Sequence, residues 1–558
     1  MSDVVRIVCL GGQDEIYKNM TCVEVNNDIF VIEAGIKFPD KTKPGIDYVI
    51  PKFDYLLQNK EKIRGYFLTH GHDSMIGALP YIIDKIPAPI YCTDLTREFL
   101  LGFCAHNSLN TDKLEFHIVE PDDDIMINGR KIELFSTCCS FAKSFGISIP
   151  SDQGNIIFIS NNIIDNNLDK GFTFNSKKLS RISEVPTLAL LCDSIHAQRQ
   201  GYTNPNNKIL HQISTSIANA PGRVFIALDA PDQYNIVNTI YFALKMQRKL
   251  VIYDAATKET IANLIKTGQL SIKKENLASI DDINRIRAQE LFILMVGFNK
   301  GLLSKISLLA RHQNDNKIVF LNESDTFIFA AHKTAENEMD ISNAIDDLHR
   351  NDCSIFAVDQ SKFLRTHASE EDIKTIISLI QPKHYVPISG TFKLLLANAK
   401  IALNTNVGLN HSNVFIIENG QVLVFMNGVG KILDQRVIYG DAMIDGKSVG
   451  EISSEILESR QRLADDGVVV LAATISKSQR KIVYGPDIQT RGLIYVKENN
   501  SLMNDLYRVF TMSINNEIVK ENYSIPAIER GVKDTISRVV KRATLKGSII
   551  IPIICEIE

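Results

Sequence analysis

The sequence predicts an α/β protein built from several domains. The chain has 558 residues, which is too long for a single hydrophobic core. Its composition, with 45% hydrophobic and 23% charged residues, is that of an ordinary globular protein and not of a disordered one. Short apolar strands alternate with helical stretches: residues 65–69 precede a helix at 75–86, and residues 89–92 precede one at 95–106. Such alternation is typical of the α/β class.

The first 204 residues predict a β-rich start that leads into this alternation. Residues 4–10, 22–25 and 28–35 are β-type runs separated by the turn-forming sequences Gly-Gly-Gln-Asp and Asn-Asn-Asp. Consecutive strands joined by such short turns indicate a meander.

From residue 205 the pattern becomes more regular and predicts a second α/β unit over residues 205–363. Residues 364–448 contain a helix, a strand and a predicted hairpin that turns at Asn419-Gly420, and we expect this part to pack on the first domain. The elements of residues 449–558 suffice for a third, small α/β domain.

The net charge of the chain does not indicate a substrate, whereas its cysteine content indicates a cellular compartment. A formal net charge of -4 gives no global field that would attract polyanions, so nucleic-acid binding would need a local basic channel. The nine cysteines include no Cys-x-x-Cys pair, which is typical of a reducing cytosol. The amino end lacks the features of a signal peptide, and no apolar run approaches the roughly 20 residues that span a bilayer. We therefore expect a cytoplasmic protein with no membrane association.

The most informative segment follows the strand at 65–69 and contains His70 and His72. Two histidines two residues apart can face one metal ion, because alternate residues in extended backbone share a side. The same pattern is compatible with two ordinary loop histidines, so the surrounding sequence must decide between a metal site and none.

The chain resembles the ribonuclease J family, the β-CASP group of RNA-degrading enzymes within the metallo-β-lactamase superfamily, nearly from end to end. The motifs that carry the resemblance include LGGQDEIYKNM from Leu10, EAGIKFPD from Glu33, THGH from Thr69, CDSIHAQRQGYT from Cys192 and GPDIQTRGLIYVKE from Gly485. The resemblance implies a metallo-β-lactamase αββα sandwich over residues 1–204 and 364–448. It also implies a β-CASP α/β domain inserted at 205–363 and a small C-terminal α/β domain at 449–558.

The resemblance further implies a two-zinc hydrolase that cleaves RNA as an exonuclease and endonuclease, with paired cations at the attacking and leaving oxygens. In the family motif His-x-His-x-Asp-His, His70 and His72 match the first two ligands, but Ser74 and Met75 replace the last two. Half of this motif is therefore absent.

The remaining family ligands are substituted as well. The next histidine of the family falls on Cys139, its bridging aspartate on Asn161 and its last histidine on Ser389. Because a neutral amide cannot bridge two divalent cations as a carboxylate does, we expect the two-zinc mechanism not to operate. One zinc ion held by His70, His72 and Cys139 is chemically reasonable; the alternative is an empty site in which Cys139 is simply buried.

The resemblance places RNA contacts at Arg365, Thr366 and His367, which align with an HVSGHA-like loop of the family. His367 is kept, whereas Arg365 and Thr366 replace small residues. An arginine can bind phosphate as a two-pronged donor, or it can fill a groove that no longer binds substrate. Asp193 and Glu33 align with further family positions and are expected to support the fold.

Two functions follow from these observations. The first is a weakly active or inactive ribonuclease J-family subunit in RNA processing, as a homodimer or as a hetero-oligomer with an active ribonuclease J. The alternative is an active zinc-dependent 5'-3' exo- and endoribonuclease that uses a single zinc ion. A small-molecule zinc hydrolase fits less well, because the inserted domain and the third domain suit a polymer.

Overall fold

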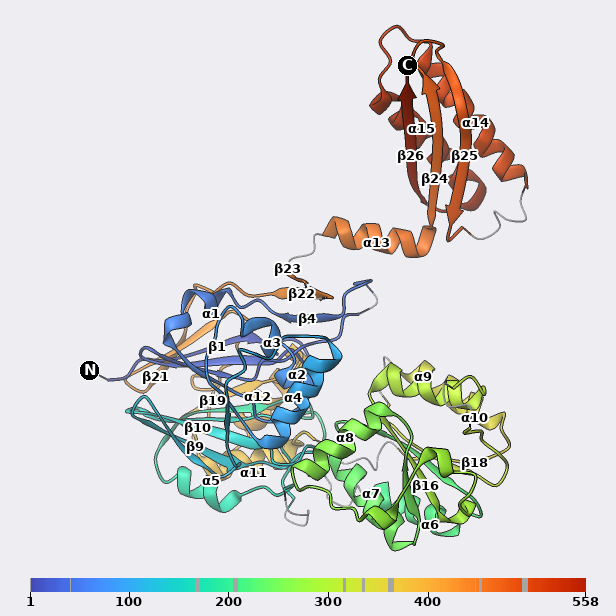
Figure 1. The fold of residues 1–558 in the computed structure, drawn as a ribbon. Helices are drawn as coiled ribbons and strands as arrows, with labels where there is room; N and C mark the ends of the chain where they lie inside the picture. Colours follow the sequence, from blue (N-terminus) through green and yellow to red (C-terminus); the bar gives the residue numbers. More distant parts are fainter. Residues whose placement is uncertain are drawn as a thin grey trace. The chain divides into compact units, whose positions relative to one another are not determined.

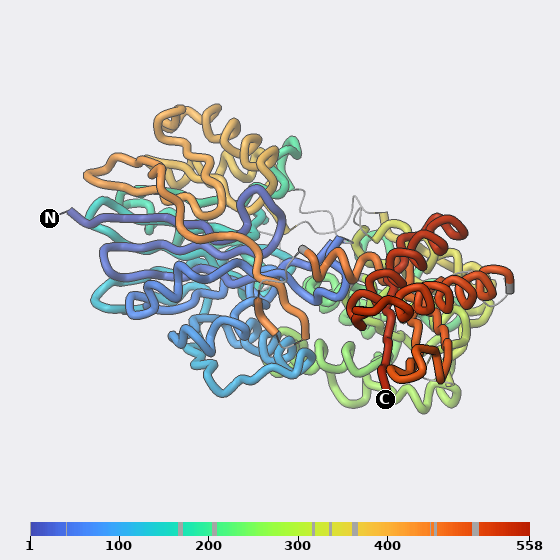
Figure 2. Tube along the Cα trace, turned by 90° about the horizontal axis from the view of Figure 1, so that it is seen from above, coloured from blue at the N-terminus to red at the C-terminus, as the bar shows by residue number. Residues whose placement is uncertain are grey.

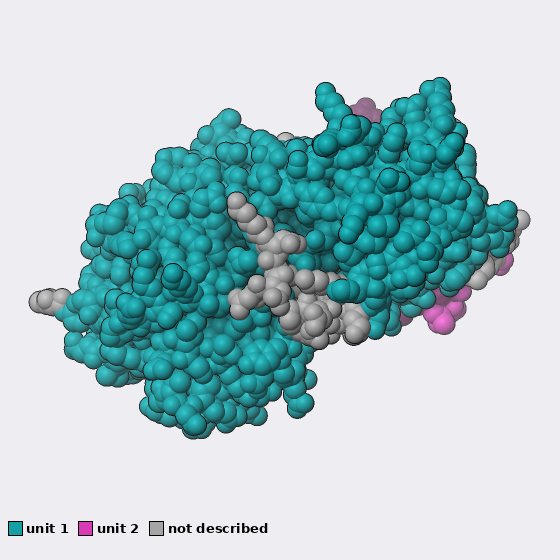
Figure 3. All heavy atoms as spheres, turned by 90° about the horizontal axis from the view of Figure 1, so that it is seen from below, with its two compact units in different colours: residues 1–37, 49–442 teal, residues 38–48, 443–558 magenta. Residues whose placement is uncertain are grey.

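The computed structural model describes residues 2–40, 42–165, 171–203, 209–314, 318–333, 337–359, 366–446, 448–450, 454–493 and 500–558. By their contacts these residues form two compact units, one with residues 1–37 and 49–442 and one with residues 38–48 and 443–558 (Figure 3). Within these described ranges, no helix has both the length and the apolarity needed to cross a membrane.

The first unit contains two sheets that pack face to face. The eight-stranded sheet has the order β21-β20-β1-β2-β3-β5-β6-β7. Its strands are β1 (Val5–Gly11), β2 (Met20–Val25), β3 (Asp28–Ile32), β5 (Ile63–Phe67), β6 (Ile90–Cys92), β7 (Phe116–Ile118), β20 (Val422–Met426) and β21 (Val429–Ile432). The first three strands pair antiparallel as the predicted meander.

The second sheet has the order β19-β12-β11-β10-β9-β8. Its strands are β8 (Asp124–Ile127), β9 (Arg130–Ser136), β10 (Phe145–Ser151), β11 (Gly154–Ile159), β12 (Thr187–Asp193) and β19 (His384–Ile388). A fully buried apolar cluster that includes Phe30, Phe67, Ile147 and Phe158 joins the two sheets. Burial of this apolar surface stabilises the sandwich.

Helices lie beside both sheets (Figure 1). Those of the first sheet are α1 (Asp54–Gln58), α2 (Asp73–Ile76), α3 (Leu79–Ile82) and α4 (Asp94–His106); those of the second are α5 (Ser176–Ile182), α11 (Glu370–Ile380) and α12 (Phe392–Leu403). The short 3-10 helix η1 (Lys60–Lys62) directly precedes β5. The other 3-10 helices, η2 (Lys274–Asn276), η3 (Ile280–Asp282) and η4 (Ala288–Glu290), lie in the part of the chain described below. The result is the αββα sandwich expected from the sequence.

Segments distant in the sequence complete the sandwich. β19 pairs parallel with β12, and β20 pairs antiparallel with β1, so that residues near 5–8 and 422–425 run side by side (Figure 2). The prediction of a hairpin through Asn419-Gly420 is wrong. β20 and β21 are instead joined at Asn427 and Gly428, which both have positive φ and so suit a tight turn, whereas Val414 forms only an isolated bridge to Tyr385.

A parallel sheet of order β15-β14-β16-β13-β17-β18 forms the other part of the first unit. Its strands are β13 (Val224–Asp229), β14 (Lys249–Ile252), β15 (Leu277–Ala278), β16 (Leu291–Gly297), β17 (Thr326–Ala330) and β18 (Ser354–Ala357). Its helices are α6 (Ile209–Asn219), α7 (Gln233–Lys245), α8 (Ala255–Lys266), α9 (Asn299–Ala310) and α10 (Glu338–His349). The central strands are continuous apolar runs because helices cover both faces of the sheet.

The second unit contains a three-stranded sheet of order β25-β24-β26. Its elements are α13 (Ser454–Asp466), β24 (Val468–Ser476), β25 (Lys481–Arg491), α14 (Asn500–Ile518), α15 (Ile525–Thr544) and β26 (Ile549–Ile557). Alternate residues of β24, including Leu471 and Ile475, pack against α14 and α15. A further small sheet, β23-β22-β4, is formed by β4 (Tyr48–Pro51), β22 (Asp441–Asp445) and β23 (Ser448–Gly450).

Candidate functional site

The two histidines singled out in the sequence lie just past the carboxyl end of β5, where the chain turns into α2. His70 is 1% exposed, and its Nε2 lies 3.1 Å from Nδ1 of His72. The ring centroids are 4.5 Å apart and the rings meet edge to face. The two-residue spacing thus brings both imidazoles to one point.

A chain of hydrogen bonds orients the ring of His70. The hydroxyl of Thr69 donates to Oε1 of Glu33 at 2.8 Å and lies 2.9 Å from Nδ1 of His70. When Glu33 is ionised, the hydroxyl proton is directed to its carboxylate, and the Thr69 oxygen accepts from Nδ1–H of His70. Because burial raises the pKa of Glu33 to about 7, the protonation of this outer carboxyl group controls the tautomer of His70.

Burial keeps both imidazoles neutral near pH 7. It lowers the pKa of His70 well below its usual value and lowers the pKa of His72 to about 4, with a further contribution from the nearby charge of His367. Neutral imidazole is the form that binds zinc. Two nitrogens on one tetrahedral zinc ion, with bonds of about 2.0–2.1 Å, lie about 3.3 Å apart. The observed 3.1 Å is close to that separation, and it is also the length of an ordinary hydrogen bond between the two rings.

Asn161 stands next to this pair, two residues beyond β11. It is 3% exposed, and its Nδ2 lies 3.5 Å from Nδ1 of His72. Among the described residues, its Oδ1 has no hydrogen-bond partner. Buried polar atoms without a partner are typical of a place that a water molecule or an ion occupies. The amide, however, supplies no negative charge.

Ser74 and Met75, in α2, are the residues expected at the aspartate and at the last histidine of the family motif. Met75 is 3% exposed, and its sulfur accepts a hydrogen bond from Nδ2 of Asn19 at 3.2 Å. The carbonyl oxygen of Ser74 approaches Gly35 so closely that a Cβ added there would lie 1.4 Å from it. Apolar packing and backbone contacts thus hold α2 in place without metal ligands.

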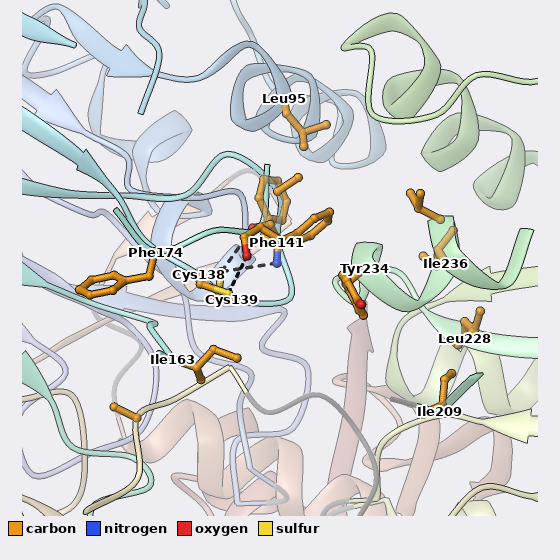
Figure 4. Close-up of a cluster of buried hydrophobic side chains, with 14 of the residues drawn as sticks. Leu95, Cys138, Cys139, Phe141, Ile163, Phe174, Ile209, Leu228, Tyr234 and Ile236 are labelled. Atoms are coloured by element: carbon orange, nitrogen blue, oxygen red, sulfur yellow. Dashed lines mark hydrogen bonds between the residues drawn. The ribbon is translucent and has the colours of Figure 1, made fainter. Parts of the chain in front are cut away.

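Cys139 is fully buried in the loop between β9 and β10. Its sulfur interacts within this loop: it lies 3.4 Å from both the amide nitrogen and the carbonyl oxygen of Phe141 (Figure 4). Burial raises the pKa of the Cys139 thiol to about 11, so the thiolate that zinc requires is disfavoured near pH 7. The ring of Phe141 lies 5.8 Å from that of His72.

Ser389 directly follows β19 and has a φ of 57° in the left-handed region. It is 5% exposed, and its carbonyl oxygen accepts a hydrogen bond from the amide of Ser194 at 3.3 Å. The hydroxyl is too short to replace an imidazole that reaches across to a metal ion.

These residues do not fit a two-zinc centre, because no carboxylate stands at the bridging position and too few imidazoles remain. In the described part of the chain, no group of three or more His, Cys, Asp or Glu side chains is arranged to hold a metal ion. His70 and His72 alone fit two ligand positions of one zinc ion, and Cys139 is not grouped with them. The single zinc ion therefore stays an expectation.

Of the three residues expected to contact RNA, Arg365 lies outside the described residues, Thr366 is half-buried, and His367 has a ring that neighbouring side chains contact. Nδ1 of His367 lies 2.8 Å from Oδ2 of Asp193, which ends β12 and is 1% exposed. The ring of His196 lies edge to face with that of His367 at 5.2 Å. The charge of His367 contributes to the lowered pKa of both His70 and His72.

Two residues at this site were missed in the sequence. Asp229 ends β13, and its Oδ2 accepts from the amide of His332 at 2.6 Å and lies 2.8 Å from Nδ1 of the same residue. Burial lowers the pKa of His332, but the hydrogen bond and charge of Asp229, with Asp232 nearby, raise it overall. The available signal was that both residues follow parallel strands at the carboxyl edge of the sheet, where α/β proteins bind ligands.

Comparisons with known proteins agree on one family. Residues 221–348 match the family described as Ribonuclease J, beta-CASP domain, and residues 455–557 match the Ribonuclease J C-terminal domain. The chain is 30% identical over 553 residues to Ribonuclease J 2 of Staphylococcus aureus strain MRSA252, covering 99% of this chain and 98% of that protein. It is 29% identical over the same length to Ribonuclease J 2 of Staphylococcus epidermidis, again covering 99% and 98%.

One solved structure is similar in fold. The crystal structure of a protein of unknown function from Enterococcus faecalis V583 aligns with a TM-score of 0.51 at 12% identity. It covers 76% of this chain and all of that protein. At this identity the likeness concerns the fold alone.

Proposed function

The chain belongs to the ribonuclease J family of RNA-processing proteins, and we propose that it is a weakly catalytic or non-catalytic subunit that assembles with an active ribonuclease J. The observation that carries the proposal is Asn161. It is a buried, neutral amide beside His72, where a two-metal nuclease needs a carboxylate between its cations.

The other substitutions support the same conclusion. Met75 and Ser389 are both buried, and each makes contacts that hold the surrounding chain in place. At both positions, contacts within the protein stand where the family motif would supply metal ligands.

A surface in the second unit supports assembly with a partner. The face of its sheet opposite α14 and α15 exposes Ile551 by 42%, Ile553 by 46% and Tyr484 by 69%. Ile551 pairs with Val470, and Ile553 with Ala472, so these apolar side chains lie together on one face. Contiguous exposed apolar side chains are typical of protein interfaces. The occupant that we propose is the active ribonuclease J.

Capture from cells tests the assembly. The full chain, carrying an affinity tag at its native expression level, is expected to retain an active ribonuclease J in a fixed ratio. The double substitution Ile551→Asp and Ile553→Asp should abolish this capture, whereas Val185→Asp and Met339→Asp, at exposed apolar residues of the first unit, should not. Recovery of the chain only as a free monomer contradicts the proposal.

A nuclease assay tests the catalytic part. The purified chain, incubated with 5'-monophosphorylated RNA, is expected to cleave no faster than its His70→Ala/His72→Ala variant. Cleavage that the double substitution abolishes supports the second candidate, a ribonuclease with one zinc ion. That candidate is favoured by the approach of Nε2 of His70 to Nδ1 of His72 at 3.1 Å, which brings two imidazoles to one point.

A further inference from the structure

The exposed side of α15 in the second unit carries a row of basic side chains. Ile528, Val532, Ile536 and Val540 recur every four residues, are at most 1% exposed and pack into the core of this unit. The opposite side of the helix exposes Arg530, Lys533, Arg538, Lys541 and Arg542. The helical period thus separates an apolar stripe from a basic one.

The basic stripe has no matching set of carboxylates. Within the described ranges, none of its five side chains forms an ion pair with an aspartate or glutamate. The acidic residues of the helix are Asp534, which is exposed, and Glu529, which is half-buried. Nε of Arg530 and Nε of Arg538 donate to backbone carbonyls one turn earlier, which uses only one of the N–H donors of each guanidinium.

Helix stability alone does not account for this arrangement. Lys541 and Arg542 lie in the last turn, where positive charge stabilises the helix dipole. Arg530, Lys533 and Arg538 lie further from that end. Arg530 with Lys533, and Arg538 with Arg542, are like charges three or four residues apart, whereas Asp534 lies four residues from both Arg530 and Arg538. Because such like and opposite pairs contribute similar energies of a few tenths of a kcal/mol, they roughly cancel, and the helix itself does not require the row.

We infer that this stripe, with the exposed Lys546 just beyond the helix, binds the phosphodiester backbone of single-stranded RNA. The inference rests on the RNA-processing function of the family and adds a contact surface in the unit that does not contain His70 and His72. From Arg530 to Arg542 the helix rises about 18 Å, enough to contact several phosphates. α15 contains no aromatic residue on which a base could stack, so binding is electrostatic and independent of sequence.

A hollow before the amino end of α15 does not extend this surface. It has a volume of about 510 Å³ and is lined by Lys477 and Arg480 but also by Glu521 and Glu556. Because its charges balance, we place the end of the RNA-binding stripe at Arg530.

Fluorescence anisotropy of the full chain with a labelled 20-nucleotide oligouridine carrying a 5'-hydroxyl tests the inference, in EDTA and over a range of KCl concentrations. The variant replaces the five stripe residues by glutamine: R530Q/K533Q/R538Q/K541Q/R542Q. Each phosphate contact adds about 0.7 to the salt slope for single strands, so losing all five contacts should lower the slope by about 3.5 and the affinity at 100 mM KCl by at least about 10-fold. The charge-matched control, K60Q/K273Q/K274Q/R285Q/R287Q, removes exposed charges of the first unit and should bind as the native chain does.

Other outcomes overturn the inference. The inference is wrong if the stripe variant binds RNA with the affinity of the native chain. It is also wrong if the control variant loses as much RNA affinity as the stripe variant. A variant that binds RNA normally but no longer captures the partner protein would mean that the stripe meets an acidic protein surface instead. Should the five-residue variant unfold, R530Q/R538Q and the charge-preserving K533R/K541R form the informative pair: the first should lose affinity and the second should not. A native chain that captures no partner but binds RNA through the stripe contradicts the proposed function and leaves this inference standing.

Discussion

Nδ1 of His367 lies 2.8 Å from Oδ2 of Asp193, although 174 residues separate the two in the sequence. Asp193 is 1% exposed and ends β12 in the second sheet of the sandwich, whereas His367 precedes α11. The pair therefore fixes the start of the returning segment against the first part of the sandwich.

This pair gives an ordered prediction. Asp193→Asn keeps the shape of the side chain but removes a charge-assisted hydrogen bond, and should lower the free energy of unfolding by about 1.5–3 kcal/mol. His367→Ala should cost more, about 3–5 kcal/mol, because it leaves the buried carboxylate of Asp193 without its partner. Urea titration followed by circular dichroism measures both. If Asp193→Asn lowered the free energy of unfolding more than His367→Ala does, the pair would not anchor this segment in the way described.

Asn161→Asp is expected to destabilise the protein without metal and to create a response to zinc. The new carboxylate would be buried, as Asn161 is at 3% exposure, and the packing of Met75 would stay. An unpaired buried charge costs several kcal/mol, and a bound zinc ion would offset part of it. We therefore expect a lower melting temperature in EDTA and a larger rise on adding zinc than in the native chain. Equal responses of the two proteins to zinc would argue against Asn161 facing the metal position.

Glu33 gives the site a specific pH dependence. Burial raises the pKa of its carboxyl from 4.5 to about 7, so the folded protein holds this proton more tightly than the unfolded chain between these pH values. Its contribution to the free energy of unfolding therefore falls as the pH rises from about 4.5 to 7, by up to about 3 kcal/mol. Glu33→Gln removes this contribution and keeps an acceptor for Thr69.

The stability of Glu33→Gln relative to the native chain should therefore increase steadily over that pH range. Measuring unfolding of both proteins at each pH cancels the titration of all other groups. A difference that is constant from pH 4.5 to 7 would mean that Glu33 has an ordinary pKa.

Gly35→Ala tests the close approach that seats α2. A Cβ at this position would lie 1.4 Å from the carbonyl oxygen of Ser74, so the chain around the two histidines must shift. We expect a loss of several kcal/mol or failure to fold, read as a drop in melting temperature. Gly301→Ala is the matched control, since nothing lies within 4 Å of its added Cβ. Because Gly301 is inside α9, that change should stabilise the protein by up to about 1 kcal/mol. Equal behaviour of the two variants would contradict the packing described for Gly35.

Local pattern was sufficient to predict much of the fold and part of the site. The alternation of strands and helices indicated the α/β class, and the two-residue spacing of His70 and His72 placed both rings together. The hairpin was misplaced because Asn419-Gly420 and Asn427-Gly428 offer the same turn chemistry. Only the pairing of β20 with β1 on one side and with β21 on the other distinguishes them.

The rest of the site depends on contacts between distant segments. The link between Asp229 and His332 requires the parallel order of β13 and β17, which no local pattern encodes. Similarly, the family resemblance placed Cys139 at an expected ligand position but did not indicate that its thiol interacts with the backbone of Phe141. Residue type and spacing predict where a donor lies along the chain, whereas its orientation is decided by packing.

Elemental analysis for zinc on the purified, untagged chain tests most directly whether this protein has kept the fold of a ribonuclease J without its pair of metal ions. After dialysis against buffer with trace zinc, we expect at most one zinc ion per chain, and none in the His70→Ala/His72→Ala variant. Two zinc ions per native chain, confirmed as adjacent sites by anomalous diffraction at the zinc edge, would contradict the account.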